Sequence, residues 1–277
     1  MKQLTLVLCL VLSQTANAAP WVSLRTTGGD GYSAVEAGGG LPLGERWTIW
    51  LRADSARSAD IVAGELRFGA DFKVTERLTP TASLVSRTEP GDIRGLGGLI
   101  GLSWNFPSLG DDFLTTLIFE GETIRYWQTV ASRATLRLAR EDVLVQRAFT
   151  FGLHQEISER WSITLNATGY SYDQDPEIWS DAVLDRYARA HALMVPVRGF
   201  PRSNSSLGVQ YLPLQELQLS LTLIATRGSD DTRGDGAVLG AQYMLEEHWS
   251  FEAQVSSSQT EGTRNGGLGS LGASYFF

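Results

Sequence analysis

The last ten residues of the chain, 268–277, constrain the fold more than any other stretch. They read LGSLGASYFF, and as a β-strand they place Leu271, Tyr275 and Phe277 on one face together with glycine and alanine. The opposite face carries mostly small and polar side chains, such as Ser270 and Ser274. One face therefore suits an apolar environment, and the other suits the inner wall of a barrel.

The first 19 residues have the pattern of a secretory signal peptide. A basic start at Lys2 is followed by an apolar run over 4–12 and by the sequence ANAA at 16–19. The apolar run is much shorter than the ~20 residues that a transmembrane helix needs. The only cysteine, Cys9, lies inside this run, so the rest of the chain offers neither disulfides nor thiolate metal ligands. We expect an exported protein in which 20–277 form one barrel domain.

Short turns and longer polar connections alternate along the rest of the chain. The short turns place a few polar residues, usually with a glutamate, before a new alternating run. They are 43–47, 74–78, 105–112, 157–161, 214–217 and 245–249. The longer connections are 27–31, 55–60, 88–94, 130–141, 173–204, 227–236 and 259–266. This order predicts fourteen antiparallel strands, or twelve if the indistinct break between 130 and 147 is not a turn.

Hydrophobic alternation and tryptophan placement favour a membrane barrel over a soluble β-sandwich. The run 161–172 alternates cleanly between apolar and polar residues, although a sandwich with one wet face would also do so. Four tryptophans stand beside proposed short turns, at one height on a barrel: Trp47, Trp104, Trp161 and Trp249. Indole side chains prefer the headgroup level of a bilayer, so we expect a membrane-interface girdle. The alternative is that they form the core of a sandwich.

The terminal aromatic pair, Tyr275 and Phe277, resembles the C-terminal strand of Gram-negative outer-membrane β-barrels. In that class this strand closes the barrel and is recognised by the insertion machinery. The mature chain is similar to outer-membrane barrels and porins as a class and matches no specific family. The resemblance implies an all-β fold, a transmembrane antiparallel up-and-down β-barrel with short periplasmic turns and longer extracellular loops. It also implies a cell outer membrane location, assembly by the barrel-insertion machinery, and contact with outer-membrane lipid and lipopolysaccharide.

The face opposite the apolar one collects charged side chains of both signs, which tolerate membrane depth only when they are paired or wet. We expect them to line the lumen of a channel or, alternatively, to fill a small closed interior as a paired network. They are Arg52, Asp54, Glu65, Arg67, Asp71, Lys73, Arg87, Glu120, Glu122, His154, Glu156 and Glu252. Arg147 is instead predicted to point outward. A bulge near Gln146 or a position close to the rim would account for it.

The longest connection, 173–204, shows apolar residues at helical spacing that ends at Pro196. We predict a helix that gates the mouth of the barrel, and the alternatives are a solvated surface helix or no helix. The residues proposed for this gate are Asp181, Arg186, Tyr187, Arg189 and His191. The segment is basic, so it could attract lipopolysaccharide or an anionic solute.

No residue pattern points clearly to catalysis. Three histidines exist, His154, His191 and His248, and none matches the signatures of barrel phospholipases, lipid A deacylases or outer-membrane proteases. His154 with Glu156 is the one pair worth naming, and a structural histidine is the favoured interpretation. We expect no catalytic residue, metal, cofactor or nucleic-acid partner.

The sequence most favours an outer-membrane channel that passes small polar solutes or serves as an export conduit. Two other classes stay open: a barrel enzyme that acts on outer-membrane lipid, and a closed structural barrel that presents its loops.

Overall fold

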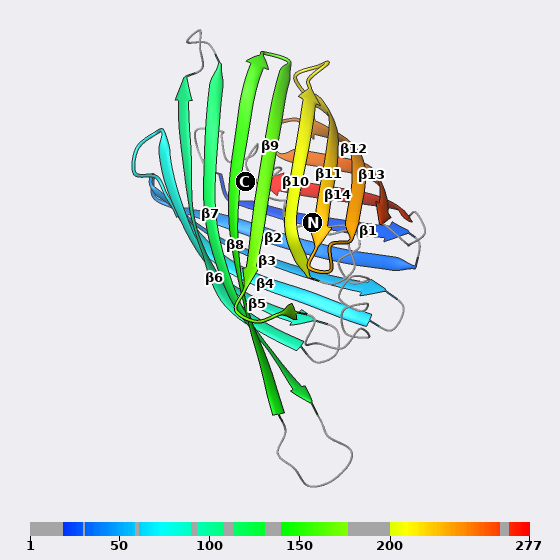
Figure 1. The fold of residues 1–277 in the computed structure, drawn as a ribbon. Coiled ribbons are helices and arrows are strands. Elements are labelled where there is room, and N and C mark those ends of the chain that lie inside the picture. The colour runs from blue at the N-terminus through cyan, green and yellow to red at the C-terminus, as the bar shows by residue number, and fades with distance from the viewer. Residues whose placement is uncertain are drawn as a thin grey trace.

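The structure is a computed structural model that describes residues 19–29, 31–58, 61–89, 93–107, 113–130, 140–176, 200–260 and 266–277. These residues form fourteen strands in one closed antiparallel barrel (Figure 1), which confirms the predicted fold class and strand number. The strands are β1 (Trp21–Gly29), β2 (Tyr32–Leu43), β3 (Trp47–Ser58), β4 (Ile61–Phe72), β5 (Leu78–Glu89), β6 (Ile93–Pro107), β7 (Leu114–Val130), β8 (Arg140–Ser158), β9 (Trp161–Tyr172), β10 (Pro201–Tyr211), β11 (Leu217–Gly228), β12 (Arg233–Leu245), β13 (Trp249–Thr260) and β14 (Gly266–Phe276). The described part of the chain contains no helix of the length and apolar character needed to cross a membrane.

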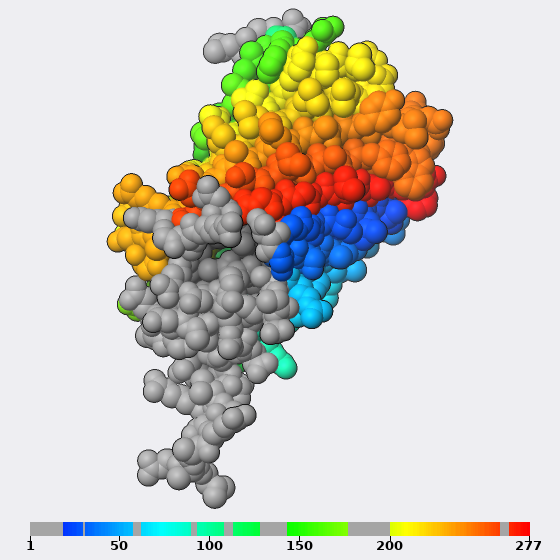
Figure 2. Space-filling model, turned by 90° about the vertical axis from the view of Figure 1, so that its right-hand side faces the viewer, coloured from blue at the N-terminus to red at the C-terminus, as the bar shows by residue number. Residues whose placement is uncertain are grey.

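The terminal strand closes the barrel. β14 pairs with β1 from Trp21 opposite Phe276 to Gly28 opposite Gly269, and every other strand pairs with its neighbours in sequence. Figure 2 shows β14 (red) lying along β1 (blue). No strand edge is left open, so the backbone hydrogen bonds of the sheet are all made within the barrel. Recognition of this strand during assembly stays a prediction.

The start of β1, the last residues of β14 and six of the connections between strands lie at the same end of the barrel. We call this end the turn end. The described turns there are 44–46, 73–77, 159–160, 212–216 and 246–248, close to the predicted positions, and the sixth connection joins Pro107 to Leu114. The other seven connections lie at the opposite end, the loop end. The longest strands, β7 and β8, form a hairpin that projects past the rest of the barrel at the bottom of Figure 1.

Four of the predicted long connections are wrong in extent. Strands cover most of 27–31, 55–60, 88–94 and 227–236, and two to four residues separate the strand ends in each case. Polar residues continue the ladder there, as where Thr88 pairs with Arg94. Backbone pairing does not require apolar side chains, so a polar composition marks where the apolar surface ends rather than where the strand ends.

Outward side chains are apolar and inward ones are mostly polar, the reverse of a soluble sheet. Leu84, Ile100 and Leu271 point outward and are 66%, 73% and 66% exposed. Thr116 and Asn166 point inward and are 0% and 3% exposed. This polarity argues against the sandwich alternative, because a sandwich buries its apolar face.

Aromatic side chains gather on the outward face at the turn end. The four tryptophans predicted for a girdle lie there half exposed, between 41% and 48%. Each has an aromatic neighbour: Trp47 with Phe72, Trp104 with Phe106, Trp161 with Tyr211, and Trp249 with Tyr275. They are therefore not the core of a sandwich, and their role at a membrane interface stays a prediction.

Two further tryptophans point inward at the turn end, and each lies against a glycine. A Cβ added to Gly40 would lie 2.3 Å from Nε1 of Trp21, and one added to Gly69 would lie 2.2 Å from Cζ2 of Trp50. The indole of Trp50 also donates a hydrogen bond to the carboxylate of Asp71. The glycines thus let two large rings lie flat against the inner wall.

We expect Gly69→Ala to destabilise the barrel by about 1–3 kcal/mol, because the rigid indole of Trp50 must move to admit the methyl group. Gly169→Ala is the matched control, since nothing lies within 4 Å of a Cβ at that strand position, and it should be neutral or slightly stabilising. Urea unfolding of both variants in lipid vesicles measures the difference. Equal stability of the two variants would contradict the proposed packing.

Candidate functional site

The lumen is the candidate site, and the strand alternation determines which side chains enter it. Most of the charged residues predicted to line it lie on inward strand positions. They are Arg52, Asp54, Glu65, Arg67, Asp71, Arg87, Glu120, Glu122, His154, Glu156 and Glu252. Lys73 follows the last residue of β4 at the turn end, where its backbone N–H donates to the carbonyl of Arg46.

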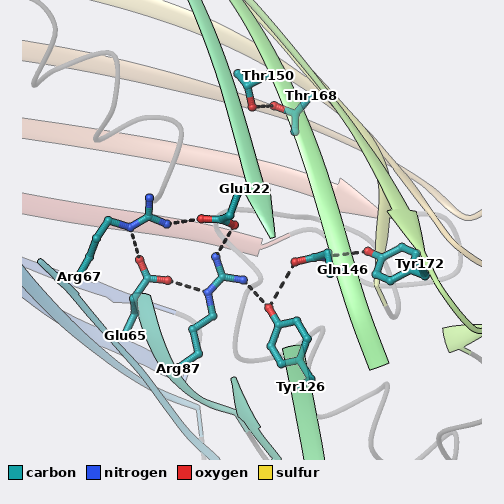
Figure 3. Close-up of polar contacts among 9 residues, drawn as sticks. All are labelled: Glu65, Arg67, Arg87, Glu122, Tyr126, Gln146, Thr150, Thr168 and Tyr172. Atoms are coloured by element: carbon teal, nitrogen blue, oxygen red, sulfur yellow. Dashed lines mark hydrogen bonds and ion pairs between the residues drawn. The ribbon is translucent and has the colours of Figure 1, made fainter. Parts of the chain in front are cut away.

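Four of these residues form one ion-pair network (Figure 3). Nε of Arg87 lies 2.8 Å from Oε2 of Glu65, and its Nη2 lies 2.8 Å from Oε1 of Glu122. Arg67 pairs with the same two glutamates. The four residues come from β4, β5 and β7. Because β6 lies between β5 and β7, these side chains meet inside the barrel. Each charge is compensated, as partly buried ions require.

The network continues as hydrogen bonds toward the loop end. The guanidinium of Arg87 donates to the hydroxyl of Tyr126, which donates to Oε1 of Gln146 at 3.3 Å. Nε2 of Gln146 donates to the hydroxyl of Tyr172 at 2.9 Å, and that hydroxyl donates to the carbonyl of Pro201 at 2.6 Å. Polar contacts therefore join five strands, β5, β7, β8, β9 and β10, inside the barrel.

A buried apolar cluster lies beside these tyrosines. Its members are Val85, Ile93, Ile124, Tyr126, Leu144 and Phe200, with Tyr172 packed against it. The edge of Phe200 meets the rings of both Tyr126 and Tyr172, at centroid distances of 6.1 Å and 5.7 Å. On this side of the lumen the loop end is thus packed solid rather than open.

A second network joins β1, β2, β3 and β13. Arg25 pairs with Glu252 and lies 4.0 Å from Glu36, which in turn lies 3.3 Å from Nε of Arg52. Gln254 donates to Glu252. Sequence reasoning missed Arg25 and Glu36. The signal was present, because Arg25 alternates with the outward Leu24 just as the predicted lumen charges alternate with their apolar neighbours.

The remaining wall is nearly uncharged. Inward positions of β11, β12 and β14 carry no charged side chain, and Glu252 is the one such residue on β13. Small, half-buried residues dominate this wall, including Ser220, Thr222, Gly240, Ser256, Ser270, Gly272 and Ser274. These short inward side chains line β11, β12 and β14, and the second network reaches this wall through Glu252 on β13.

Two other sequence-predicted residues, His154 and Glu156, have structural partners. Nδ1 of His154 lies 3.0 Å from Oγ1 of Thr164, and Oε2 of Glu156 accepts a hydrogen bond from the amide of Leu114 at 2.9 Å. The two side chains share a face, yet each is held by a different strand. No group of three or more His, Cys, Asp or Glu residues suited to a metal ion occurs among the residues that the structure describes.

Two predictions concern residues that the structure does not describe. The proposed gate residues Asp181, Arg186, Tyr187, Arg189 and His191 lie outside the described residues, as does the signal peptide over 1–18.

Arg147 points outward, as predicted. The β7–β8 register is continuous past it, and the β8 irregularity lies between Glu156 and Ser158, so a bulge near Gln146 is wrong and the position toward the loop end accounts for it.

No protein-family model and no curated protein matches the chain. Among solved structures, the barrel is similar to the CymD monoaromatic hydrocarbon channel, with a TM-score of 0.59 and 12% identity over 95% of this chain and 90% of that chain. It is also similar to the Pseudomonas putida toluene transporter TodX (0.54, 9%, 95% and 90%) and the Ralstonia pickettii toluene transporter TbuX (0.54, 11%, 95% and 91%). At these identities the likeness concerns the fold alone, a closed β-barrel that this chain shares with these channel and transporter structures.

We expect Glu122→Gln to destabilise the barrel by roughly 2–4 kcal/mol, because it removes charge-assisted hydrogen bonds to two arginines and leaves both guanidinium groups to share the single carboxylate of Glu65. Asp235→Asn is the control, since Asp235 is an exposed outward acid whose loss should change stability by less than about 0.5 kcal/mol. Adding Arg67→Met to Glu122→Gln should recover part of the loss. Urea unfolding that gives Glu122→Gln the stability of the unchanged protein would contradict the network's role.

Proposed function

We propose that this protein is an outer-membrane channel through which small polar solutes move along the barrel axis. Its turn end then faces the periplasm and its loop end the cell exterior. The observation that carries the proposal is the polarity of the two faces: apolar outside over the span between the turns and the outward arginines, and hydroxylic or charged inside. A lumen of this kind holds water, whereas the outer face suits lipid.

The path we propose follows the small-residue wall of β11–β14. Serine, threonine and glycine there have short side chains, whereas the ion-pair networks lie mainly on β1–β7 and reach this wall only through Glu252 on β13. Most of the charged residues of both networks lie near the middle of their strands, and Arg87 lies toward the loop end of β5, so they narrow the path over its central part. A charged constriction of this kind sets which solutes pass.

A polar solute suits this lumen better than the hydrocarbons after which the CymD channel and the TodX and TbuX transporters are named. An apolar solute beside the Glu65, Arg67 and Glu122 side chains would displace water from charged groups without replacing its hydrogen bonds. The strand pairing is also continuous around the whole barrel, which supports axial rather than sideways movement. The same axial path would serve either uptake or export.

The balance of charge favours cations and neutral solutes over anions. The inward acids on the described strands are Glu36, Asp54, Glu65, Asp71, Glu89, Glu120, Glu122, Glu156 and Glu252. The inward bases are Arg25, Arg52, Arg67 and Arg87. Acids outnumber bases, so the lumen carries a negative field even after its ion pairs are counted.

We expect the purified protein to give steady conductance in a planar bilayer and a cation-selective reversal potential under a KCl gradient. Glu120→Gln should lower the cation-to-anion permeability ratio roughly two- to fourfold, because it removes an inward acid that forms no ion pair with a described residue. Asp235→Asn removes the same charge from the outer face and should leave the ratio unchanged.

Each outcome of that measurement is informative. Silence from a barrel shown to be folded would contradict the channel and favour lipid hydrolysis or loop presentation. Conductance with anion preference would contradict the inference from charge while leaving the channel itself supported.

A further inference from the structure

We propose that three outward arginines at the loop end, Arg94, Arg125 and Arg147, form a site for the phosphate groups of an anionic lipid in the outer leaflet. The inference rests on the proposed location in the outer membrane but not on conduction. It concerns the outer face of the β6–β7–β8 wall, which takes no part in the lumen.

The strand register brings the three side chains together. Arg125 pairs with Leu96 on β6 and with Val145 on β8, so Arg94 and Arg147 are its diagonal neighbours on the two sides. Diagonal neighbours on one face of a sheet lie about 7–8 Å apart, within reach of long side chains. All three arginines are exposed, so their guanidinium groups can converge on a shared ligand.

No acid of the described chain compensates these three charges. None of the three forms an ion pair with a described residue. The acid next to Arg147 in the register, Asp173, instead accepts a hydrogen bond from the amide of Val145 at 2.7 Å. By contrast, Nε of the outward Arg227 lies 3.0 Å from Asp231. Three adjacent guanidinium groups without an anion match the several oxygens of a phosphate, which Arg binds through paired hydrogen bonds.

The outward surface between the three arginines and the turn end is apolar, which favours a lipid as the ligand. Leu96, Ile100 and Phe149 lie there on the outward face and are 58%, 73% and 60% exposed. On β6 and β8 an apolar outward residue therefore lies two positions from the arginine on its turn-end side, and on β8 the apolar Val145 lies two positions away on its loop-end side as well. The indole-bearing Trp127, which pairs with Arg94, is a side chain typical of the headgroup level. A phosphorylated glycolipid places its phosphates at the arginines and its acyl chains on the apolar patch.

The test compares binding of two lipids by native mass spectrometry of the purified protein. Wild-type protein should retain bisphosphorylated lipid A. The triple variant R94Q/R125Q/R147Q should bind it about 100-fold more weakly, since each basic residue near an anionic surface contributes roughly fivefold. Lipid A without phosphates should bind wild-type protein as weakly as the triple variant binds the phosphorylated lipid. R227Q is the matched control and should bind like wild type, because it removes an arginine already paired with Asp231.

Folding is checked by heat-modifiable migration in gels, and if the triple variant does not fold, R125Q alone should weaken binding about fivefold. Three results would overturn the proposal. They are unchanged lipid A binding by the folded arginine variants, equal retention of the phosphate-free lipid by wild type, and binding of inorganic phosphate alone as tight as that of the lipid.

Discussion

Closure of the hydrogen-bonded sheet between β1 and β14 is the constraint on which the rest of this molecule depends. In an apolar surrounding, an unpaired backbone N–H or C=O has no water to bind, so only a sheet without edges is stable. The pairing of Trp21 with Phe276 begins that seam, and the amide of Phe277 extends it by donating to the carbonyl of Pro20. Once the seam fixes the register, strand alternation sends every second side chain outward.

The interior follows from that sorting. Inward charges on neighbouring and non-neighbouring strands must find partners, because an uncompensated ion in a narrow lumen is costly. Glu122 meets this need for two arginines at once, and Arg25 does so for Glu36 and Glu252. The networks hold the inward arginines of β1–β5, whereas β11, β12 and β14 carry uncharged and mostly small inward side chains. The asymmetry of the inner wall therefore originates in the charge and size of its residues.

Much of this arrangement can be predicted from the sequence, and the reasons for the failures are physical. Residues 268–277 and the alternation over 161–172 predict faces correctly, because a period of two needs only local geometry. The partners of Arg87 cannot be predicted this way, since they depend on the register and curvature of several strands. Strand ends at the loop end were also missed, as polar residues pair their backbones as well as apolar ones do. The inward position of Arg25 follows from the same alternation, because the residue before it, Leu24, points outward.

Aromatic residues show both the reach of this rule and its limit. Trp47 and Trp50 are three residues apart on β3, an odd separation that puts them on opposite faces, but the contact of Trp50 with Gly69 depends on the β3–β4 register. Arginine shows a parallel contrast. Arg67 and Arg87 point inward and are compensated by Glu65 and Glu122, whereas Arg94, Arg125 and Arg147 point outward near the loop end and have no acid of the described chain beside them. The first group is satisfied by the protein itself. The second is satisfied only by what surrounds the barrel at that height, so the outward arginines carry information about the environment that the fold alone does not.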